Sequence, residues 1–238
     1  MAETPSAPAP PESASTIFGN ALAAATQFAE LLAAVGIERG LIGPREVDRL
    51  WERHLLNSAV VGERIPQGVR VIDIGSGAGL PGVPLALARP DLDVTLLEPM
   101  ARRVAWLEEV VQTVRLSAAV VRGRAEEPDI KQQLSGADVV VARAVAPLDK
   151  LWGWSAPLLR QGGRLIALKG ESAEAEVARD GAAVRRAGGS QPVVERCGVG
   201  VLETPTTVIE IERVDADARE GTHGRRSGRT RKDRSQRR

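Results

Sequence analysis

The feature that most constrains the fold of this chain is a glycine-rich turn directly after a short apolar run. Residues 71–82 read Val-Ile-Asp-Ile-Gly-Ser-Gly-Ala-Gly-Leu-Pro-Gly. The run predicts a strand that ends at Ile74, and the glycines after it permit positive φ and close contact between backbone and ligand. A helix is expected to begin near Gly82, so that its unpaired N–H groups point into the same turn. Together these features predict a site for a nucleoside.

Two nucleoside cofactors fit such a turn. The pattern Asp-x-Gly-x-Gly-x-Gly, met by Asp73, Gly75, Gly77 and Gly79, resembles motif I of class I S-adenosylmethionine-dependent methyltransferases. The dinucleotide pattern Gly-x-Gly-x-x-Gly also fits, but it would begin three residues beyond the end of the strand. Glu98 ends the next apolar run and can accept hydrogen bonds from a ribose diol. We therefore favour S-adenosylmethionine over a nicotinamide or flavin nucleotide, and we predict that it is bound by Gly75, Gly77, Gly79 and Glu98.

The composition indicates one α/β domain with modest additions. The chain has 238 residues, of which 43% are hydrophobic. Its single cysteine, Cys197, is incompatible with a disulfide framework or a cysteine metal cluster, so we predict a reducing cytoplasm and no metal site. No apolar run approaches twenty residues, and the N-terminus lacks the basic-then-apolar order of a secretion signal. We therefore expect no membrane association, and we expect a monomer.

The formal charge of +1 conceals an uneven distribution. Residues 223–238 contain seven Arg and one Lys against one acid, and the rest of the chain has 24 basic and 30 acidic residues. We predict a disordered basic tail over 214–238 and a flexible leader over 1–14. The tail can hold RNA through phosphate contacts or can be a solvated segment without a specific partner, and the composition leaves both open.

The residues between leader and tail, 15–213, are expected to form one methyltransferase domain. Its first part, 15–68, contains two helices, over 15–35 and from Pro44 onward. The buried face of the second helix is marked by Val47, Leu50, Trp51, His54, Leu55 and Ser58. We interpret His54 as a packed, hydrogen-bonded residue rather than a catalytic one.

The second part, 69–213, is expected to be a Rossmann-like core, because strand and helix patterns alternate along it. This alternation requires a mainly parallel sheet with right-handed crossovers. The expected strands are 69–74, 93–98, 117–122, 137–142 and 163–169. The expected helices are 82–89, 100–114, 126–134, 148–159 and 171–187. Two final runs, 192–199 and 206–213, predict a hairpin that completes a seven-stranded sheet.

Ligands of an open parallel sheet bind beyond the carboxyl ends of the strands, and three of the loops there carry cations. These cations are Arg122 and Arg124, Arg143, and Lys169. A positive rim around an adenosine pocket indicates an anionic substrate such as nucleic acid. Position favours a functional role for Arg143, Arg124 is as compatible with a solvated surface, and Lys169 can simply pair with Glu171.

The loop after the fourth strand narrows the acceptor chemistry. Residues 142–147 read Ala-Arg-Ala-Val-Ala-Pro, without the Asn/Asp-Pro-Pro-aromatic sequence usual in enzymes that methylate exocyclic amines. No cysteine lies in 71–170, so a covalent route to carbon-5 of a pyrimidine is absent too. Guanine N7 fits, because its lone pair is free in the neutral base. Catalysis would then consist of holding N7 in line with the methyl group, with an arginine on guanine O6 or on a phosphate.

Four segments resemble the RsmG family (glucose-inhibited division protein B), the guanine-N7 methyltransferases of small-subunit ribosomal RNA. They are Leu50-Trp-Glu-Arg-His-Leu-Leu-Asn-Ser58, residues 71–82, Arg143-Ala144 and Ala167-Leu-Lys-Gly170. The resemblance covers about residues 15–213. It implies methyl transfer from S-adenosylmethionine to N7 of a guanine in the decoding-region loop of 16S ribosomal RNA. It also implies cofactor contacts at Gly75, Leu80, Ala125, Glu126 and Arg143, and catalytic roles for Arg124 and Arg143.

The residues themselves leave other classes of function open. The same fold serves small-molecule methyltransferases, for which the arginines of the rim would be dispensable. A non-catalytic RNA-binding module with an inactive cofactor site would also carry the basic tail. Gly75, Gly77, Gly79 and Glu98 are all present, which favours a functional cofactor site over this last alternative and over a glycine turn without a ligand.

Overall fold

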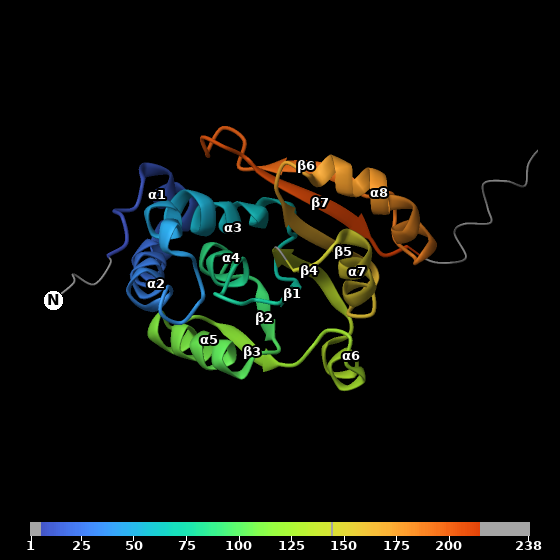
Figure 1. Cartoon of the computed structure of the whole chain (residues 1–238), viewed down its shortest axis with the longest axis horizontal. Coiled ribbons are helices and arrows are strands. Elements are labelled where there is room, and N and C mark those ends of the chain that lie inside the picture. The colour runs from blue at the N-terminus through green and yellow to red at the C-terminus, as the bar shows by residue number, and fades with distance from the viewer. Residues whose placement is uncertain (1–5, 144, 215–238) are drawn as a thin grey trace, which may run out of the picture.

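A seven-stranded mixed sheet forms the centre of the computed structural model, which describes residues 6–143 and 145–214 (Figure 1). The strand order is β3-β2-β1-β4-β5-β7-β6. The strands are β1 Arg70–Ile74, β2 Asp93–Glu98, β3 Ala118–Arg122, β4 Ala137–Arg143, β5 Leu159–Lys169, β6 Val193–Cys197 and β7 Thr206–Glu212. The first five are parallel, whereas β7 lies antiparallel between β5 and β6. This confirms the predicted mainly parallel sheet and its closing hairpin.

Helices cover both faces of the sheet. One layer contains α1 Glu12–Phe18, η1 Gly19–Ala21, α2 Leu22–Val35, η2 Pro44–Arg49, η3 Leu50–Leu56, α3 Asn57–Ala59, η4 Val60–Arg64, α4 Gly82–Ala88 and α5 Ala101–Thr113. The other layer contains α6 Pro128–Leu134, α7 Leu148–Ser155 and α8 Ala173–Arg186. In Figure 1 the first layer lies to the left of the strands and the second to the right.

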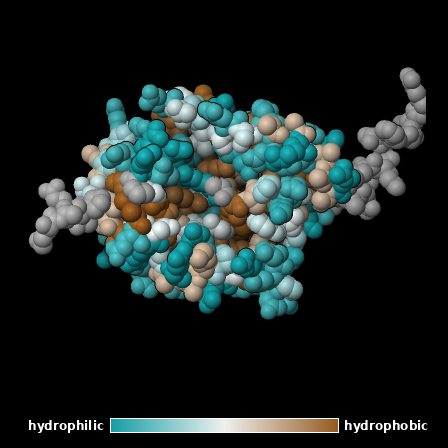
Figure 2. Space-filling model, viewed as in Figure 1, coloured by the Kyte–Doolittle hydropathy of each residue, from teal (hydrophilic) through white to brown (hydrophobic). Residues whose placement is uncertain are grey.

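The side chains of the strands alternate between the two layers, as the pleat of a β-strand requires. Val71, Val139 and Val141 belong to the core beside the first layer, whereas Ile72 and Val140 belong to the core beside the second. The sheet is therefore buried on both sides, as is typical of parallel strands. On the surface of the face shown in Figure 2, hydrophobic residues gather in the middle, with hydrophilic residues around them.

The N-terminal helix differs from the prediction at both its start and its middle. It begins at Glu12 instead of residue 15, and a 3₁₀ turn interrupts it at Gly19-Asn20, two residues with poor helix propensity. The Trp51 indole donates a hydrogen bond of 2.8 Å to the Pro8 carbonyl, and Ala14 is fully buried. Residues 6–14 of the expected flexible leader therefore have defined contacts with the domain. Residues 1–5 and nearly all of the expected basic tail, 215–238, lie outside the described residues.

The second helical segment begins at Pro44, as predicted, but its pitch changes along its length. The first turn, η2, is 3₁₀, and it is followed by the seven-residue π-helix η3, the short α3 and another 3₁₀ turn, η4. A π-helix of this length is uncommon, and π-turns often occur at functional sites. The helical segment ends at Arg64. The predicted buried face is confirmed, since every residue named for it is less than 9% exposed.

Most other boundaries agree with the predictions to within two residues. The exception is the helix expected over 148–159, which ends at Ser155 as α7. The following strand starts early, at Leu159, because this residue pairs with Ala137 before a shift in register between β4 and β5. Local pattern cannot reveal such a long-range pairing, so the prediction extended the helix into the strand.

The stretch Glu12–Val35 is long and apolar enough to cross a membrane when judged by length and composition alone. This is weak evidence of membrane association, because the core helix of a soluble protein passes the same test. Phe18, Phe28 and Leu32 of this stretch are buried in the protein's own core. Its apolar face therefore already has a partner within the domain.

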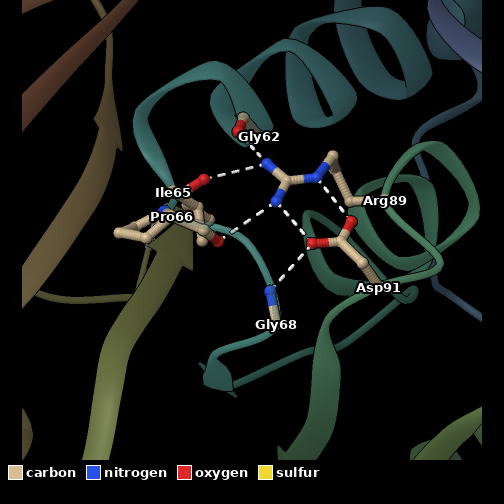
Figure 3. A network of polar contacts seen from close by, with 6 residues as sticks. All are labelled: Gly62, Ile65, Pro66, Gly68, Arg89 and Asp91. Atoms are coloured by element: carbon tan, nitrogen blue, oxygen red, sulfur yellow. Dashed lines mark hydrogen bonds and ion pairs between the residues drawn. The ribbon is translucent and has the colours of Figure 1, made fainter.

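Arg89, directly after α4, ties the loop before β1 to the end of that helix (Figure 3). Its guanidinium donates two hydrogen bonds of 2.7 Å to the Asp91 carboxylate and three to the carbonyls of Gly62, Ile65 and Pro66. Asp91 also accepts a hydrogen bond from the Gly68 N–H, and Arg89 holds the pKa of Asp91 well below its usual range. This network fixes the chain at the entrance to β1 and thus the direction in which the strand reaches the glycine turn.

We predict that Arg89→Ala destabilises the fold more than Asp91→Ala does. The first change leaves three carbonyls without their donor and should cost about 2–3 kcal/mol, whereas the second removes a partly exposed ion pair worth about 1 kcal/mol. Urea unfolding of both variants at neutral pH measures the difference. Equal losses would mean that the contacts to the three carbonyls add nothing to stability.

Candidate active site

A cavity of about 600 Å³ lies at the carboxyl ends of the central strands. It is lined by Gly75, Ser76, Gly77, Ala78 and Leu80 after β1, by Glu98, Pro99, Met100 and Arg103 after β2, by Arg124 after β3, by Arg143 and Val145 at β4, and by Leu41, Ile42, Gly43, Glu46 and His54 from the N-terminal layer. The structure thus brings together six of the residues predicted for the site: Gly75, Gly77, Leu80, Glu98, Arg124 and Arg143.

Three other predicted site residues do not line this cavity. Gly79 faces the helical layer, where a Cβ atom would lie 2.8 Å from Val83 Cγ2 and 3.3 Å from the Phe28 ring. This glycine therefore permits close packing of the turn on α2 and α4. Ala125 is buried behind the loop after β3, and Glu126 is exposed on it.

Glu98 joins the ends of β1 and β2 from inside the protein. Its carboxylate is 1% exposed and accepts two hydrogen bonds of 2.9 Å, one from the Gly77 N–H and one from the Met100 N–H. The Arg103 guanidinium lies 4.0 Å away. Each carboxylate oxygen retains a further lone pair, so Glu98 can hold the turn in place and still accept hydrogen bonds from a hydroxyl in the cavity.

Asp73 orders the turn from beneath. Its side chain is fully buried, and Oδ2 accepts a hydrogen bond of 3.0 Å from the Gly82 N–H at the start of α4. Oδ1 has no hydrogen-bond partner within residues 6–143 and 145–214. Burial raises the pKa of Asp73 to about 7, and the negative charge of Glu98 adds to this shift. The Asp73 carboxyl therefore holds its proton over most of the mildly acidic range.

Glu46 and His54 bring a polar chain to the wall of the cavity. His54 Nε2 lies 2.6 Å from Glu46 Oε2, and His54 Nδ1 lies 2.6 Å from Arg143 Nη2. Burial and the nearby Arg143 charge lower the pKa of His54 to about 4, and burial also lowers the pKa of Arg143. The interpretation of His54 as packed and hydrogen-bonded is confirmed. Its contact with Arg143 was not predicted, because 89 residues separate the two in the chain.

The remaining cations of the predicted rim have different places. Arg124 is exposed at the cavity, and Arg122 is exposed outside it. Lys169 Nζ pairs with Glu176 at 2.7 Å and donates a hydrogen bond to the Ala146 carbonyl, so the predicted pairing with Glu171 is wrong. Glu176 lies five residues beyond Glu171, on α8, and its carboxylate meets Lys169 at the end of β5. Lys169 therefore anchors the loop after β4.

Helix α5 supports two segments of the cavity wall. The Trp106 indole donates a hydrogen bond of 3.0 Å to the Ala78 carbonyl in the glycine turn. On the other side, Arg39 stacks 5.4 Å from the centre of the Trp106 ring and pairs with Glu109 at 2.6 Å. These contacts hold the segment that leads to Leu41, Ile42 and Gly43 of the cavity wall. Arg103 of the same helix also reaches the cavity, although the helical pattern assigns it to the solvent-facing side.

The fold and this arrangement define a class I S-adenosylmethionine-dependent methyltransferase. Solved structures of that class have the same fold at low sequence identity. A putative S-adenosyl-L-methionine-dependent methyltransferase from Methanococcus maripaludis aligns with a TM-score of 0.55 and 17% identity, over 73% of this chain and 93% of that one. Fibrillarin from Aeropyrum pernix, solved with natively bound S-adenosyl-L-methionine, aligns with a TM-score of 0.50 and 18% identity, over 67% and 74% of the two chains.

Sequence comparison identifies the family within this class. The family model for rRNA small subunit methyltransferase G (GidB) matches residues 21–201. The chain is 52% identical over 219 residues to ribosomal RNA small subunit methyltransferase G of Mycolicibacterium gilvum, covering 92% of this chain and 96% of that protein. It is 56% identical over 204 residues to the protein of the same name from Mycobacterium marinum, covering 86% and 90%. The chain therefore belongs to the RsmG family, as its sequence motifs predicted.

We predict that Asp73→Asn changes how stability depends on pH. The Asp73 pKa is about 7 in the folded protein against 3.8 for the free side chain, so between these values only the folded state holds the proton. The wild type must then lose stability as pH rises through this window. The amide cannot ionise, so the variant should gain about 2–3 kcal/mol relative to the wild type between pH 5 and pH 8. Urea unfolding without cofactor at both pH values measures this gain, and parallel pH profiles would contradict it.

Proposed function

We propose that this chain transfers a methyl group from S-adenosylmethionine to N7 of a guanine in the decoding-region loop of 16S ribosomal RNA. Membership of the RsmG family supports ribosomal RNA of the small subunit as the acceptor. The observation that carries the reaction type is the single cavity that Gly77, Glu98 and Arg143 share. It joins the glycine turn that we assign to the nucleoside to a half-buried cation on the neighbouring strand.

The residues of the cavity fit the proposed cofactor. The volume of about 600 Å³ lies within the range of small-molecule sites. Gly75 and Gly77 present backbone without side chains, and Glu98 would accept hydrogen bonds from the ribose. Leu80 lines the same wall and would contact the adenosyl group. S-adenosylmethionine, when bound, supplies an electrophilic methyl group.

The titratable groups of the cavity favour an acceptor that needs no deprotonation. Glu98 is engaged by two backbone N–H groups, and the two ring nitrogens of His54 contact Glu46 and Arg143. A general base must be within hydrogen-bond reach of the proton that it removes. Both ring nitrogens of His54 are already engaged, and the free lone pairs of Glu98 are the ones that we assign to the ribose of the cofactor. The N7 atom of neutral guanine has a free lone pair, so positioning alone can serve catalysis there.

Arg143 is the residue that we assign to the acceptor base. Arg143 lines the cavity, and its Nη1 is buried without a hydrogen-bond partner among the described residues, so the guanidinium has hydrogen-bonding capacity that these residues do not use. Donation to guanine O6 or to a flanking phosphate would orient the base and leave the N7 lone pair free. Arg124, exposed at the cavity, would contact the RNA beside it.

This proposal extends to the setting of the reaction. We infer that the domain expected over 15–213 carries it, that the protein acts in the cytoplasm as a monomer, and that its substrate is 16S ribosomal RNA or the small ribosomal subunit. The basic tail lies almost entirely outside the described residues, so its phosphate contacts stay a prediction.

We predict that cells lacking this gene lose one N7-methylguanine from 16S ribosomal RNA, detected by mass-spectrometric mapping. The wild-type gene should restore the mark, whereas Arg143→Ala should lower kcat/KM on the unmodified RNA by roughly 100-fold, because the base loses its orienting donor. Arg102→Ala, a change to an exposed arginine on α5, is the matched control and should restore the mark. An unchanged set of modified guanines in the deletion strain would contradict the proposal.

A further inference from the structure

A chain of two short hydrogen bonds connects three separate elements beside the cavity. Glu46 belongs to η2, His54 to η3 and Arg143 to the end of β4. The contacts are 2.6 Å from Glu46 Oε2 to His54 Nε2 and 2.6 Å from His54 Nδ1 to Arg143 Nη2. All three residues line the cavity. These two hydrogen bonds therefore link the N-terminal layer to the arginine that we assign to the acceptor base.

Only one protonation state of His54 satisfies both contacts. A guanidinium has donors and no acceptor, so His54 Nδ1 must accept from Arg143. The ring proton then lies on Nε2, where it is donated to the Glu46 carboxylate. The pKa of about 4 agrees with a neutral ring at physiological pH. In this tautomer both hydrogen bonds are donated in the same direction: Arg143 donates to His54, and His54 donates to Glu46.

A neutral histidine has a consequence that a carboxylate would not have. A carboxylate opposite an arginine commonly binds two of its N–H groups and neutralises its charge. Within the described residues Arg143 makes no ion pair with a carboxylate, and His54 occupies only one of its nitrogens. The guanidinium is thus held in one orientation at the cavity wall, no carboxylate among the described residues pairs with its charge, and its Nη1 has no partner among them.

The local fold holds the imidazole in place. His54 is 7% exposed, and Trp51 in the same π-helical turn is 3% exposed. Trp51 packs edge-on against Phe18 and donates to the Pro8 carbonyl. The wide π-turn is therefore fixed on its inner side by α1 and the segment before it. Glu46 is further steadied by Arg53, whose Nη1 lies 3.8 Å from its carboxylate.

We propose that Glu46 and His54 are positioning residues for methyl transfer, which fix the Arg143 guanidinium toward the acceptor base without neutralising it. This proposal rests on the function proposed above, since it takes Arg143 as the contact to the base. It assigns a role to two residues outside the motif that binds the cofactor.

Two substitutions of His54 distinguish its hydrogen bond to Arg143 from its hydrogen bond to Glu46. Asn places its amide near the position of Nδ1, so His54→Asn can still accept from Arg143. Gln places its amide near Nε2, so His54→Gln can still meet Glu46 but cannot reach Arg143. We expect kcat on unmodified 16S ribosomal RNA to fall by about fivefold in His54→Asn and on the order of 100-fold in His54→Gln. The dissociation constant of S-adenosylmethionine should stay unchanged in both.

Glu46→Ala tests the far end and guards against misfolding of the His54 variants. It should lower kcat by about tenfold with unchanged cofactor affinity, while Glu52→Ala, a change to an exposed acid on η3, should leave kcat as it is. Nitrogen-15 NMR of the His54 ring in the full chain gives a readout that stability alone does not move. It should report a proton on Nε2 in the wild type.

The outcomes distinguish this inference from the proposed function. Equal turnover of the two His54 variants, full turnover of Glu46→Ala, or a proton on Nδ1 of the wild type would each overturn the positioning role while leaving the methyltransferase assignment intact. A wild-type protein that binds S-adenosylmethionine and methylates no guanine of 16S ribosomal RNA would instead overturn the proposed function.

Discussion

The buried carboxylate of Glu98 determines the shape of the cavity. By accepting hydrogen bonds from Gly77 and Met100 it joins the turn after β1 to the turn after β2, two segments that parallel strands bring side by side. The Gly75 and Ser76 N–H groups add bonds of 2.8 and 3.2 Å to the Leu97 carbonyl at the same place. These hydrogen bonds within the protein hold both turns in place, which lowers the ordering cost of binding a nucleoside there.

A second constraint acts on Arg143, the cation at the end of β4 that lines the same cavity. Arg143 is held by a neutral ring instead of a carboxylate, and Glu46 makes its hydrogen bond to that ring and not to the guanidinium. The charge of Glu46 still acts on Arg143 from behind the ring. The cavity thus combines a backbone turn with one oriented, half-buried guanidinium that has no ion pair among the described residues. Partly desolvated charges of this kind are costly to fold and are common at sites that bind charged or strongly polar groups.

The sequence predicted the parts of the fold that depend on local pattern. Alternation of apolar runs and helical periodicity located the strands from Arg70 to Glu212, and glycine spacing located the turn at 75–79. The carboxylate at Glu98 could be assigned because parallel neighbours end at the same edge. The first helix was predicted to begin three residues too late, at residue 15 instead of Glu12, because the contacts that order the segment before it, such as that of Trp51 with Pro8, join distant segments.

The missing parts of the site are non-local for the same reason. His54 and Arg143 are in contact although 89 residues separate them in the sequence. Glu46 reaches His54 because a 3₁₀ turn leads directly into a π-helix of seven residues. The spacing of apolar residues over so short a segment cannot reveal this change of helical pitch. Gly79 fits the cofactor motif, but the structure uses it for packing against Phe28 and Val83. A motif assigns chemistry to a turn as a whole, and the three-dimensional contacts decide which of its residues face the ligand.

In the function proposed above, S-adenosylmethionine lies across the tip of β1. Calorimetric titration of S-adenosylmethionine into the wild type, Gly77→Val and Gly68→Val tests it most directly. Both glycines have positive φ, +54° and +68°, so both valines impose similar backbone strain, but only Gly77 lines the cavity. We predict that affinity falls at least about tenfold in Gly77→Val and is retained in Gly68→Val. Wild-type affinity in Gly77→Val, or an equal loss in both variants, would contradict this placement of the cofactor.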